Sequence, residues 1–281
     1  MDIPRGKAGC LFLVYILIGC GKSLPAPIPP PTPVSTSPLT VWMFNYAPGA
    51  MRYQISRSAA IEIRSDSSNG REISTNTTNE IITLAPTGDS GIAFTAVVDA
   101  FSTTTQGLIG PVQPVHLPVQ LSGLFAGDSL AISNDSANKC NPVSSALLSD
   151  LHSLLTRFPA QLSRGLVWRD SVVMSGCQAG VPTTSRTMRS YVVSGEAIYE
   201  DRPILLVQRS DIIHAHGEGA QQQHQLTLDA EGTGSAVYYL DMGNGRVARL
   251  TAEQELNLTV TTSGKPHRFK QTSRQDFRFT R

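Results

Sequence analysis

The chain has few aromatic residues, few cysteines and none of the short motifs that mark several common enzyme classes. Aromatic residues make up 6% of the 281 residues, and four cysteines are present. There is no Gly-x-Ser-x-Gly turn to present a serine nucleophile, and no His-Glu-x-x-His helix, Cys-x-x-Cys pair or glycine-rich phosphate loop. These absences favour a non-enzymatic protein, so we expect no catalytic residue and no cofactor.

The charge balance argues against a general nucleic-acid binder. Lysine and arginine number 23 and aspartate and glutamate number 22, so the formal net charge is +1. Nucleic-acid-binding domains normally carry a basic excess that neutralises phosphate groups. We therefore expect no nucleic-acid partner.

The apolar run near the N-terminus is too short to cross a bilayer as a helix. It extends from Leu11 to Ile18, whereas a spanning helix needs roughly 20 apolar residues. Arg5 and Lys7 precede the run, and Lys22 follows it. A basic start, a short apolar core and small residues at its end are typical of a signal peptide, here residues 1–19.

The end of this segment is more specific. Leu17-Ile18-Gly19-Cys20 resembles the lipobox of bacterial lipoproteins, in which the cysteine is acylated and becomes the first residue of the mature protein. The resemblance covers residues 1–20 and implies that Cys20 anchors the protein to a lipid bilayer of the bacterial cell envelope. Gly21 stands where inner-membrane lipoproteins carry aspartate, which favours the outer membrane. The alternative is an ordinary signal peptide that is cleaved elsewhere.

A proline-rich segment follows the lipobox. Seven of the 18 residues from Gly21 to Pro38 are proline. Such segments adopt extended polyproline II at about 3.1 Å per residue, so this one would reach on the order of 50 Å. We interpret residues 20–38 as the lipidated cysteine and a spacer, although a disordered tail would have a similar sequence.

Residues 39–281 show the pattern of a β-rich body. Apolar and polar residues alternate with a period of two along several segments, which is typical of strands with one face in the core. Examples are Met51, Tyr53 and Ile55, and Leu256, Leu258 and Val260. Turn signals such as Gly243-Asn244-Gly245 separate the segments. The pattern predicts a mainly β fold, an antiparallel meander that forms a sandwich or a half-barrel.

One amphipathic helix interrupts this pattern. From residue 142 to 158 the apolar residues follow helical spacing, with Pro142 suited to the first helical position and Pro159 to the end. The helix divides the strands into two blocks, residues 39–139 and 166–281. Because its apolar face is wide, we expect it to pack on a sheet face beside Trp168, with any pocket at the rim of that contact.

Two cysteines remain in the body after removal of Cys10 with the signal peptide and acylation of Cys20. We predict a disulfide between Cys140 and Cys177, since an exported protein meets an oxidising environment. The alternatives are two free thiols or a metal pair. The bridge would tie the start of the helix to the hairpin near Cys177.

The densest cluster of candidate metal ligands is Ile212-Ile213-His214-Ala215-His216-Gly217-Glu218. His214 and His216 share a face of a strand, and with His224 or Glu218 they could bind Zn²⁺. The favoured interpretation is a solvated strand, so we predict no metal site and keep these histidines as weak candidates. Trp168-Arg169-Asp170-Ser171 is interpreted as core rather than as a catalytic group.

The last segment carries a basic stripe. Arg268, Lys270, Arg274 and Arg278 alternate with apolar residues such as Phe277. Such a stripe could meet anionic lipid headgroups or envelope polymers. We favour an edge strand that uses positive charge to block aggregation.

Two functions fit these observations. The first is a membrane-anchored envelope lipoprotein that binds an apolar ligand or a protein partner without catalysis. The alternative is a surface-tethered hydrolase, with or without zinc. A deep pocket lined by valine, leucine and phenylalanine would favour an apolar ligand. Convergence of His214, His216 and a carboxylate would favour the hydrolase.

Overall fold

The computed structural model describes residues 31–33, 40–64, 71–87, 92–106, 117–126, 129–133, 142–178, 181–221 and 224–280. The expected signal peptide, the lipidated Cys20 and Cys140 lie outside these residues. The side chains of Cys177 and His224 are also outside the description, so the disulfide stays a prediction. Among the described residues, no helix has the length and hydropathy needed to cross a bilayer.

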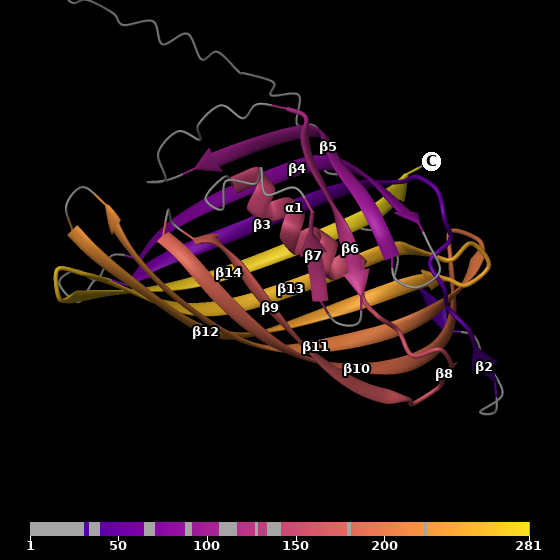
Figure 1. Cartoon of the computed structure of the whole chain (residues 1–281). Helices are drawn as coiled ribbons and strands as arrows, with labels where there is room; N and C mark the ends of the chain where they lie inside the picture. The colour runs from indigo at the N-terminus through magenta and orange to yellow at the C-terminus, as the bar shows by residue number, and fades with distance from the viewer. Residues whose placement is uncertain are drawn as a thin grey trace, which may run out of the picture. The chain divides into compact units, whose positions relative to one another are not determined.

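The body consists of many long strands and one helix (Figure 1). The strands are β1 (Thr32–Pro33), β2 (Val41–Trp42), β3 (Met51–Arg64), β4 (Arg71–Thr87), β5 (Ile92–Gln106), β6 (Val119–Ala126), β7 (Ser129–Ile132), β8 (Leu162–Ser163), β9 (Val167–Gln178), β10 (Val181–Tyr199), β11 (Arg202–Gln221), β12 (His224–Asp241), β13 (Arg246–Thr262) and β14 (Lys265–Thr280). The helix α1 spans Pro142–Leu154.

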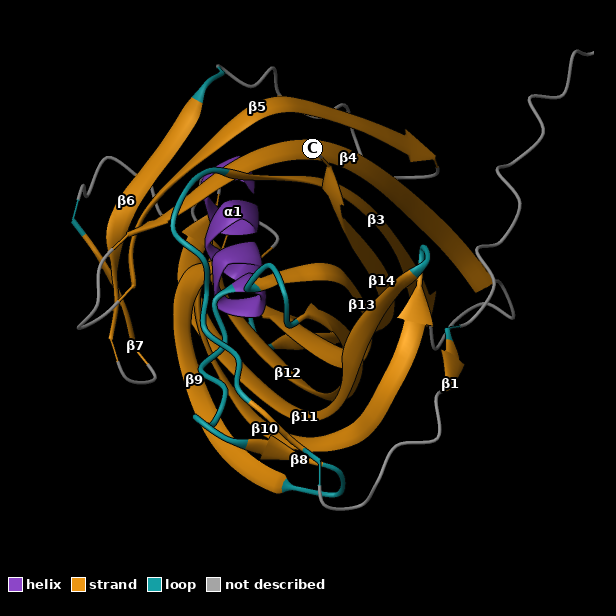
Figure 2. Cartoon of the chain, turned by 90° about the vertical axis from the view of Figure 1, so that its right-hand side faces the viewer, coloured by secondary structure: helices purple, strands orange, loops and turns teal. Residues whose placement is uncertain are grey.

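Twelve of these strands form one antiparallel sheet, in the order β1-β10-β11-β12-β13-β14-β3-β4-β5-β6-β7, with β9 also paired to β10. The sheet curls around α1 and is not closed (Figure 2). The predicted fold class, mainly β and antiparallel with one helix, is confirmed. The single curled sheet corresponds to the half-barrel rather than to the sandwich, and the other described sheet contains only β2 and β8.

The two predicted strand blocks join into one sheet through β14. This strand pairs with β13 on one side and with β3 on the other, for example Phe277 with Leu250 and with Ile55. The prediction that the basic C-terminal segment is an edge strand is therefore wrong. Alternation along a strand shows which side chains are buried, but both an edge and a central strand can alternate.

Two glycines allow backbone segments to approach each other closely, one between two strands of the sheet and one in a turn. A Cβ atom at Gly232 would lie 2.0 Å from the carbonyl oxygen of Glu255 on the neighbouring strand. Gly245 ends the turn between β12 and β13 with a φ of +55°, and a Cβ there would lie 2.3 Å from the carbonyl oxygen of Asn45. Only glycine fits both positions without moving the backbone.

The helix packs its apolar face on the concave side of the sheet, which we call the inner face. Its residues Val143, Leu147, Leu151, Leu154 and Leu155, the last just past its end, have at most 1% of their surface exposed. Burying each such side chain contributes about 1.5–3 kcal/mol. Trp168 stacks on Tyr191 at 4.8 Å and meets Phe158 edge-on at 6.2 Å. The predicted packing of the helix on a sheet face is confirmed, and α1 contacts β9, the strand that carries Trp168.

The helix is four residues shorter than predicted and ends at Leu154. The hydroxyl of Tyr46 donates to the carbonyl oxygen of Leu154 at 2.7 Å and accepts from the backbone N–H of Thr156 at 3.0 Å. The hydroxyl of Tyr238 donates to the carbonyl oxygen of Ser153 at 3.0 Å. Because Tyr46, between β2 and β3, and Tyr238 on β12 satisfy these terminal groups, the backbone can leave the helix before Pro159.

Candidate functional site

The predicted histidine cluster lies on the exposed outer face of β11. His216 Nδ1 is 2.8 Å from Asp229 Oδ1, and its Nε2 is 3.5 Å from Glu218 Oε1. His214 Nδ1 is 3.9 Å from Glu231 Oε1. The hydrogen bond to Asp229 raises the pKa of His216 above its ordinary value. The described residues contain no group of three His, Cys, Asp or Glu side chains placed to hold a metal ion.

Two of the four basic side chains of the β14 stripe pair with carboxylates on its neighbour β13. Lys270 Nζ lies 2.8 Å from Glu255 Oε1, and Arg274 Nε lies 3.1 Å from Glu253 Oε1. These pairs sit on the outer face of a central part of the sheet, so each contributes only about 0–1 kcal/mol. They also reduce the positive surface that binding to an envelope polymer would use.

A second set of charges lies on the inner face, beside the helix. We call Asp170, Arg189, Arg209 and Asp211 the inner polar belt. Arg189 donates through Nε and Nη2 to the two carboxylate oxygens of Asp170, at 2.6 and 2.7 Å. Arg209 donates through Nη2 to Asp211 Oδ2 at 2.9 Å. Buried charges persist in proteins when they are paired in this way.

Strand register brings the belt together. Asp170 faces Arg189 across β9 and β10, and Arg189 faces Asp211 across β10 and β11. Asp211 in turn faces Gly234 on β12, where a Cβ would lie 3.2 Å from an Asp211 carboxylate oxygen. The missing side chain at Gly234 leaves room for the Asp211 carboxylate.

The inner polar belt also holds the C-terminal part of α1. Arg189 Nη1 donates to the carbonyl oxygen of His152 at 3.1 Å, and Arg209 Nη1 donates to the Tyr238 hydroxyl at 2.6 Å. Tyr238 in turn donates to the helix. A cation at a helix C-terminus is favourable because the helix dipole places negative charge there. The belt is therefore a polar support for the helix.

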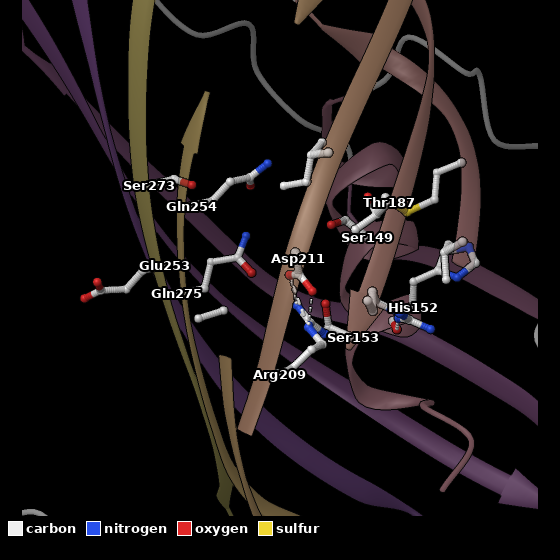
Figure 3. A pocket seen from close by; sticks show the side chains of 15 residues that line it. Ser149, His152, Ser153, Thr187, Arg209, Asp211, Glu253, Gln254, Ser273 and Gln275 are labelled. Atoms are coloured by element: carbon white, nitrogen blue, oxygen red, sulfur yellow. Dashed lines mark hydrogen bonds and ion pairs between the residues drawn. The ribbon is translucent and has the colours of Figure 1, made fainter. Parts of the chain in front are cut away.

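A small cavity of about 90 Å³ lies at this contact (Figure 3). The side chains of Ser149 and Ser153 from the helix line it together with Arg209, Asp211 and Gln275 from the sheet. Its position at the rim of the helix contact is the predicted one. Pockets for drug-sized ligands measure about 300–1,000 Å³, so this cavity fits a small polar group and not an acyl chain.

Burial of His152 on α1 makes the stability of the protein dependent on pH. Loss of solvation lowers the pKa of His152 to about 4, and the charge of Arg189 acts in the same direction. In the unfolded chain its pKa is about 6.5, so below that pH the unfolded state binds more protons. We expect this group to lower the free energy of unfolding as the pH falls from 6.5 to 4, by about 3 kcal/mol in all.

Urea unfolding of wild type and of His152→Gln at pH 7 and at pH 4.5 measures this effect. Other groups titrate in both proteins, so the quantity to compare is the difference between their pH slopes. Equal slopes in the two proteins would contradict the assignment of a neutral, buried imidazole.

The outer face carries a contiguous apolar surface. We call Val173, Met188 and Ile212 the outer apolar patch; their side chains are 61%, 44% and 49% exposed. Met188 and Ile212 face each other across β10 and β11. Val173 faces Arg186 across β9 and β10, so it is diagonal to Met188. Contiguous exposed apolar groups with polar neighbours are typical of interaction sites.

No protein-family model and no curated protein sequence matches the chain. Among solved structures, a triple mutant of the Rh. blastica porin is 10% identical, with a TM-score of 0.23 over 81% of this chain and 100% of the porin chain. Pseudomonas aeruginosa OccK2 (OpdF) in complex with glucuronate is 8% identical, with a TM-score of 0.20 over 83% of this chain and 98% of that one. Similarity at this level supports no conclusion about site, function or location.

Sequence reasoning missed the inner polar belt, although β11 carries a usable signal. Its inward positions are Leu205, Val207, Arg209, Asp211 and Ile213. Two charged residues thus interrupt an apolar alternation at positions where water is excluded. Such an interruption predicts buried ion pairs. The residues on other strands that pair with these charges can be found only from the register between the strands.

Proposed function

We propose that the protein is a lipid-anchored envelope lipoprotein whose β body is a non-enzymatic docking module for another envelope protein. The anchor rests on the lipobox resemblance at Cys20. The docking function rests on one observation, the outer apolar patch. Three large apolar side chains on three adjacent strands expose 44–61% of their surface to solvent.

The surroundings of the patch indicate what the partner carries. Arg186 faces Val173 across the strand pair and is exposed. Within the part of the chain that the structure describes, Arg186 makes no ion pair. A partner with an apolar surface and acidic residues at its rim would complement both the patch and this charge.

The other functions have less support. The inner cavity of about 90 Å³ is too small for an acyl chain. A larger hollow of about 800 Å³ has the volume, but residues such as Ser58, Thr233 and Gln254 line it rather than the valine, leucine and phenylalanine expected for an apolar ligand. For the hydrolase, the exposed histidines already have carboxylate neighbours and form no described three-ligand group. Neither observation supplies a positive argument for those functions.

Site-specific photocrosslinking in cells tests the proposal. A photoreactive residue at Ile212 is expected to give one dominant adduct with a second envelope protein. The same residue at Leu124 on β6 is a matched control, since this side chain is also apolar and 43% exposed. Met188→Ser is expected to weaken the Ile212 adduct, and Arg186→Glu to weaken it further by repelling an acidic rim.

The outcomes are distinguishable. Because Met188 is exposed, its replacement is expected to change stability by less than about 0.5 kcal/mol, so a lost adduct reports lost contact and not unfolding. Adducts of equal intensity at Ile212 and Leu124 would refute the patch as a docking site. An adduct between two copies of this chain would show that the patch mediates self-association and would contradict the proposed partner.

A further inference from the structure

A pocket of about 130 Å³ lies at the end of the sheet where two turns and the last strand meet. One turn joins β10 to β11 and the other joins β12 to β13. Arginine side chains from three strands line the pocket: Arg202, Arg246 and Arg278. It is far along the strands from the outer apolar patch and shares no residue with it.

Positive charge exceeds negative charge around this pocket. Asp276 is shared by two arginines, accepting from Arg249 at 2.8 and 3.1 Å and from Arg278 at 2.6 and 2.8 Å. Arg246 Nη2 is 3.1 Å from Asp241 Oδ2. Arg202 makes no ion pair within the described ranges, and the remaining carboxylate at the pocket is Glu200.

Among the residues that line the pocket, three guanidinium groups thus face two carboxylates, those of Glu200 and Asp241, which leaves an excess of one positive charge. Burial raises the pKa of Tyr199 above its ordinary value, and the charge of Glu200 and a hydrogen bond between the two side chains act in the same direction. Of the three pocket arginines, Arg202 is the one without a carboxylate partner among the described residues, whereas Arg246 and Arg278 pair with Asp241 and Asp276.

One pocket arginine, Arg246, is fixed in position, and one of its donor atoms has no acceptor. The guanidinium of Arg246 lies over the ring of Phe279 at 4.0 Å, and Asp241 is itself held by the side chain and backbone N–H of Asn244. Arg246 Nε is buried and has no acceptor among the described residues. A guanidinium held in place with free N–H groups suits a planar or tetrahedral oxyanion.

The pocket lies where the chain enters the body. Strand β1 pairs with β10 at Thr32–Ile198 and Pro33–Ala197, immediately before Tyr199. The segment that follows the proposed lipid anchor therefore joins the sheet next to this pocket. Ile198 is 40% exposed at the same place. Because the tether joins the body at this end, arginines here can reach anionic groups at a membrane surface.

We propose that the pocket formed by Arg202, Arg246 and Arg278 binds a phosphate group. The phosphate of an anionic lipid headgroup and a free phosphate share the chemistry that this pocket recognises. The position beside the chain entry favours the lipid headgroup, and this choice of source rests on the proposed lipid anchor. The phosphate site itself stands without it.

The test uses the purified full-length protein in a neutral, phosphate-free detergent. Inorganic phosphate is titrated at constant ionic strength while broadening of its ³¹P resonance is followed. Arg202→Gln is expected to weaken binding by about tenfold or more, since it removes a charge-assisted hydrogen bond. Arg268→Gln is the matched control, because Arg268 is an exposed arginine at the other end of β14. It should bind as wild type does.

A second variant and a competition complete the test. Arg278→Gln should also weaken binding, and circular dichroism confirms that each variant is folded. Displacement of inorganic phosphate by dihexanoyl phosphatidylglycerol, and not by dihexanoyl phosphatidylcholine, would identify the lipid headgroup as the source. Phosphate binding without displacement would identify a soluble phosphate compound. No broadening, or equal broadening in wild type, Arg202→Gln and Arg278→Gln, overturns the proposal, whatever becomes of the lipid anchor.

Discussion

Replacing Cys20 with serine is expected to abolish lipidation and leave the full precursor uncleaved. Transfer of the diacylglyceryl group forms a thioether, which requires the sulfur of a cysteine, and the resemblance implies that cleavage follows this transfer. Each buried methylene contributes about 0.8 kcal/mol to membrane binding, and stable anchoring takes more than one chain. Loss of the acyl chains should therefore abolish anchoring of the protein through lipid.

Metabolic labelling with a radioactive fatty acid measures this result, together with the size of the product on a gel. Cys10→Ser is a matched control, because Cys10 lies in the same segment ahead of the proposed cleavage site. It should keep both label and cleavage. Equal label in the Cys20→Ser protein and in wild type would show that the lipobox interpretation is wrong.

The second large effect is expected at the ion pair between Arg57 on β3 and Asp150 on the helix. Asp150 is fully buried, and the Arg57 side chain is 15% exposed. Arg57→Ala leaves a buried carboxylate without this cation. Removing one partner of a buried pair typically costs about 3–5 kcal/mol, so we expect a loss of that size in the free energy of unfolding.

Chemical denaturation of the purified protein measures this loss. Arg52→Ala on the same strand is the control, since Arg52 is 50% exposed and lies 4.0 Å from Asp99. Its removal should cost less than about 1 kcal/mol. Replacing the pair by Arg57→Met with Asp150→Leu should recover much of the stability, because no buried charge remains. A loss below about 1 kcal/mol in Arg57→Ala would mean that water reaches Asp150.

The helix has a consequence for function. Its apolar face fills the inner side of the curled sheet, and its polar groups are bound by Arg57, Arg189 and Tyr238. The part of the inner face beneath the helix is therefore occupied by the chain's own residues. Two surfaces that the helix leaves open among the described residues are the outer apolar patch and the arginine pocket at the end where the chain enters.

The local pattern of apolar residues was sufficient to predict individual strands and the helix. The alternation of Met51, Tyr53 and Ile55 predicted a strand with one buried face, and those three residues are at most 6% exposed in β3. The spacing of Leu147 and Leu151 predicted a helix with a buried stripe. Both periods follow from backbone geometry within one segment, so they can be recognised without knowing the neighbours.

Other features depended on which strands became neighbours. His214 and His216 share a face, as their spacing of two requires, but only the register shows that Asp229 and Glu231 lie opposite them. The sequence carries the charges of the inner polar belt at inward positions of three strands. It does not show that Arg189 meets Asp170 and Asp211, because that depends on the turns and bulges that set the pairing.

By itself, the sequence determined the period of each segment, the apolar face of the helix and the absence of several catalytic motifs. It also supplies the lipobox resemblance, on which the proposed location rests. Only the tertiary structure decided that β14 pairs with β3, more than two hundred residues earlier, and so lies within the sheet. The physical reason is that alternation is a property of one strand, whereas pairing, curl and the meeting of Arg202, Arg246 and Arg278 depend on contacts between segments distant in the chain.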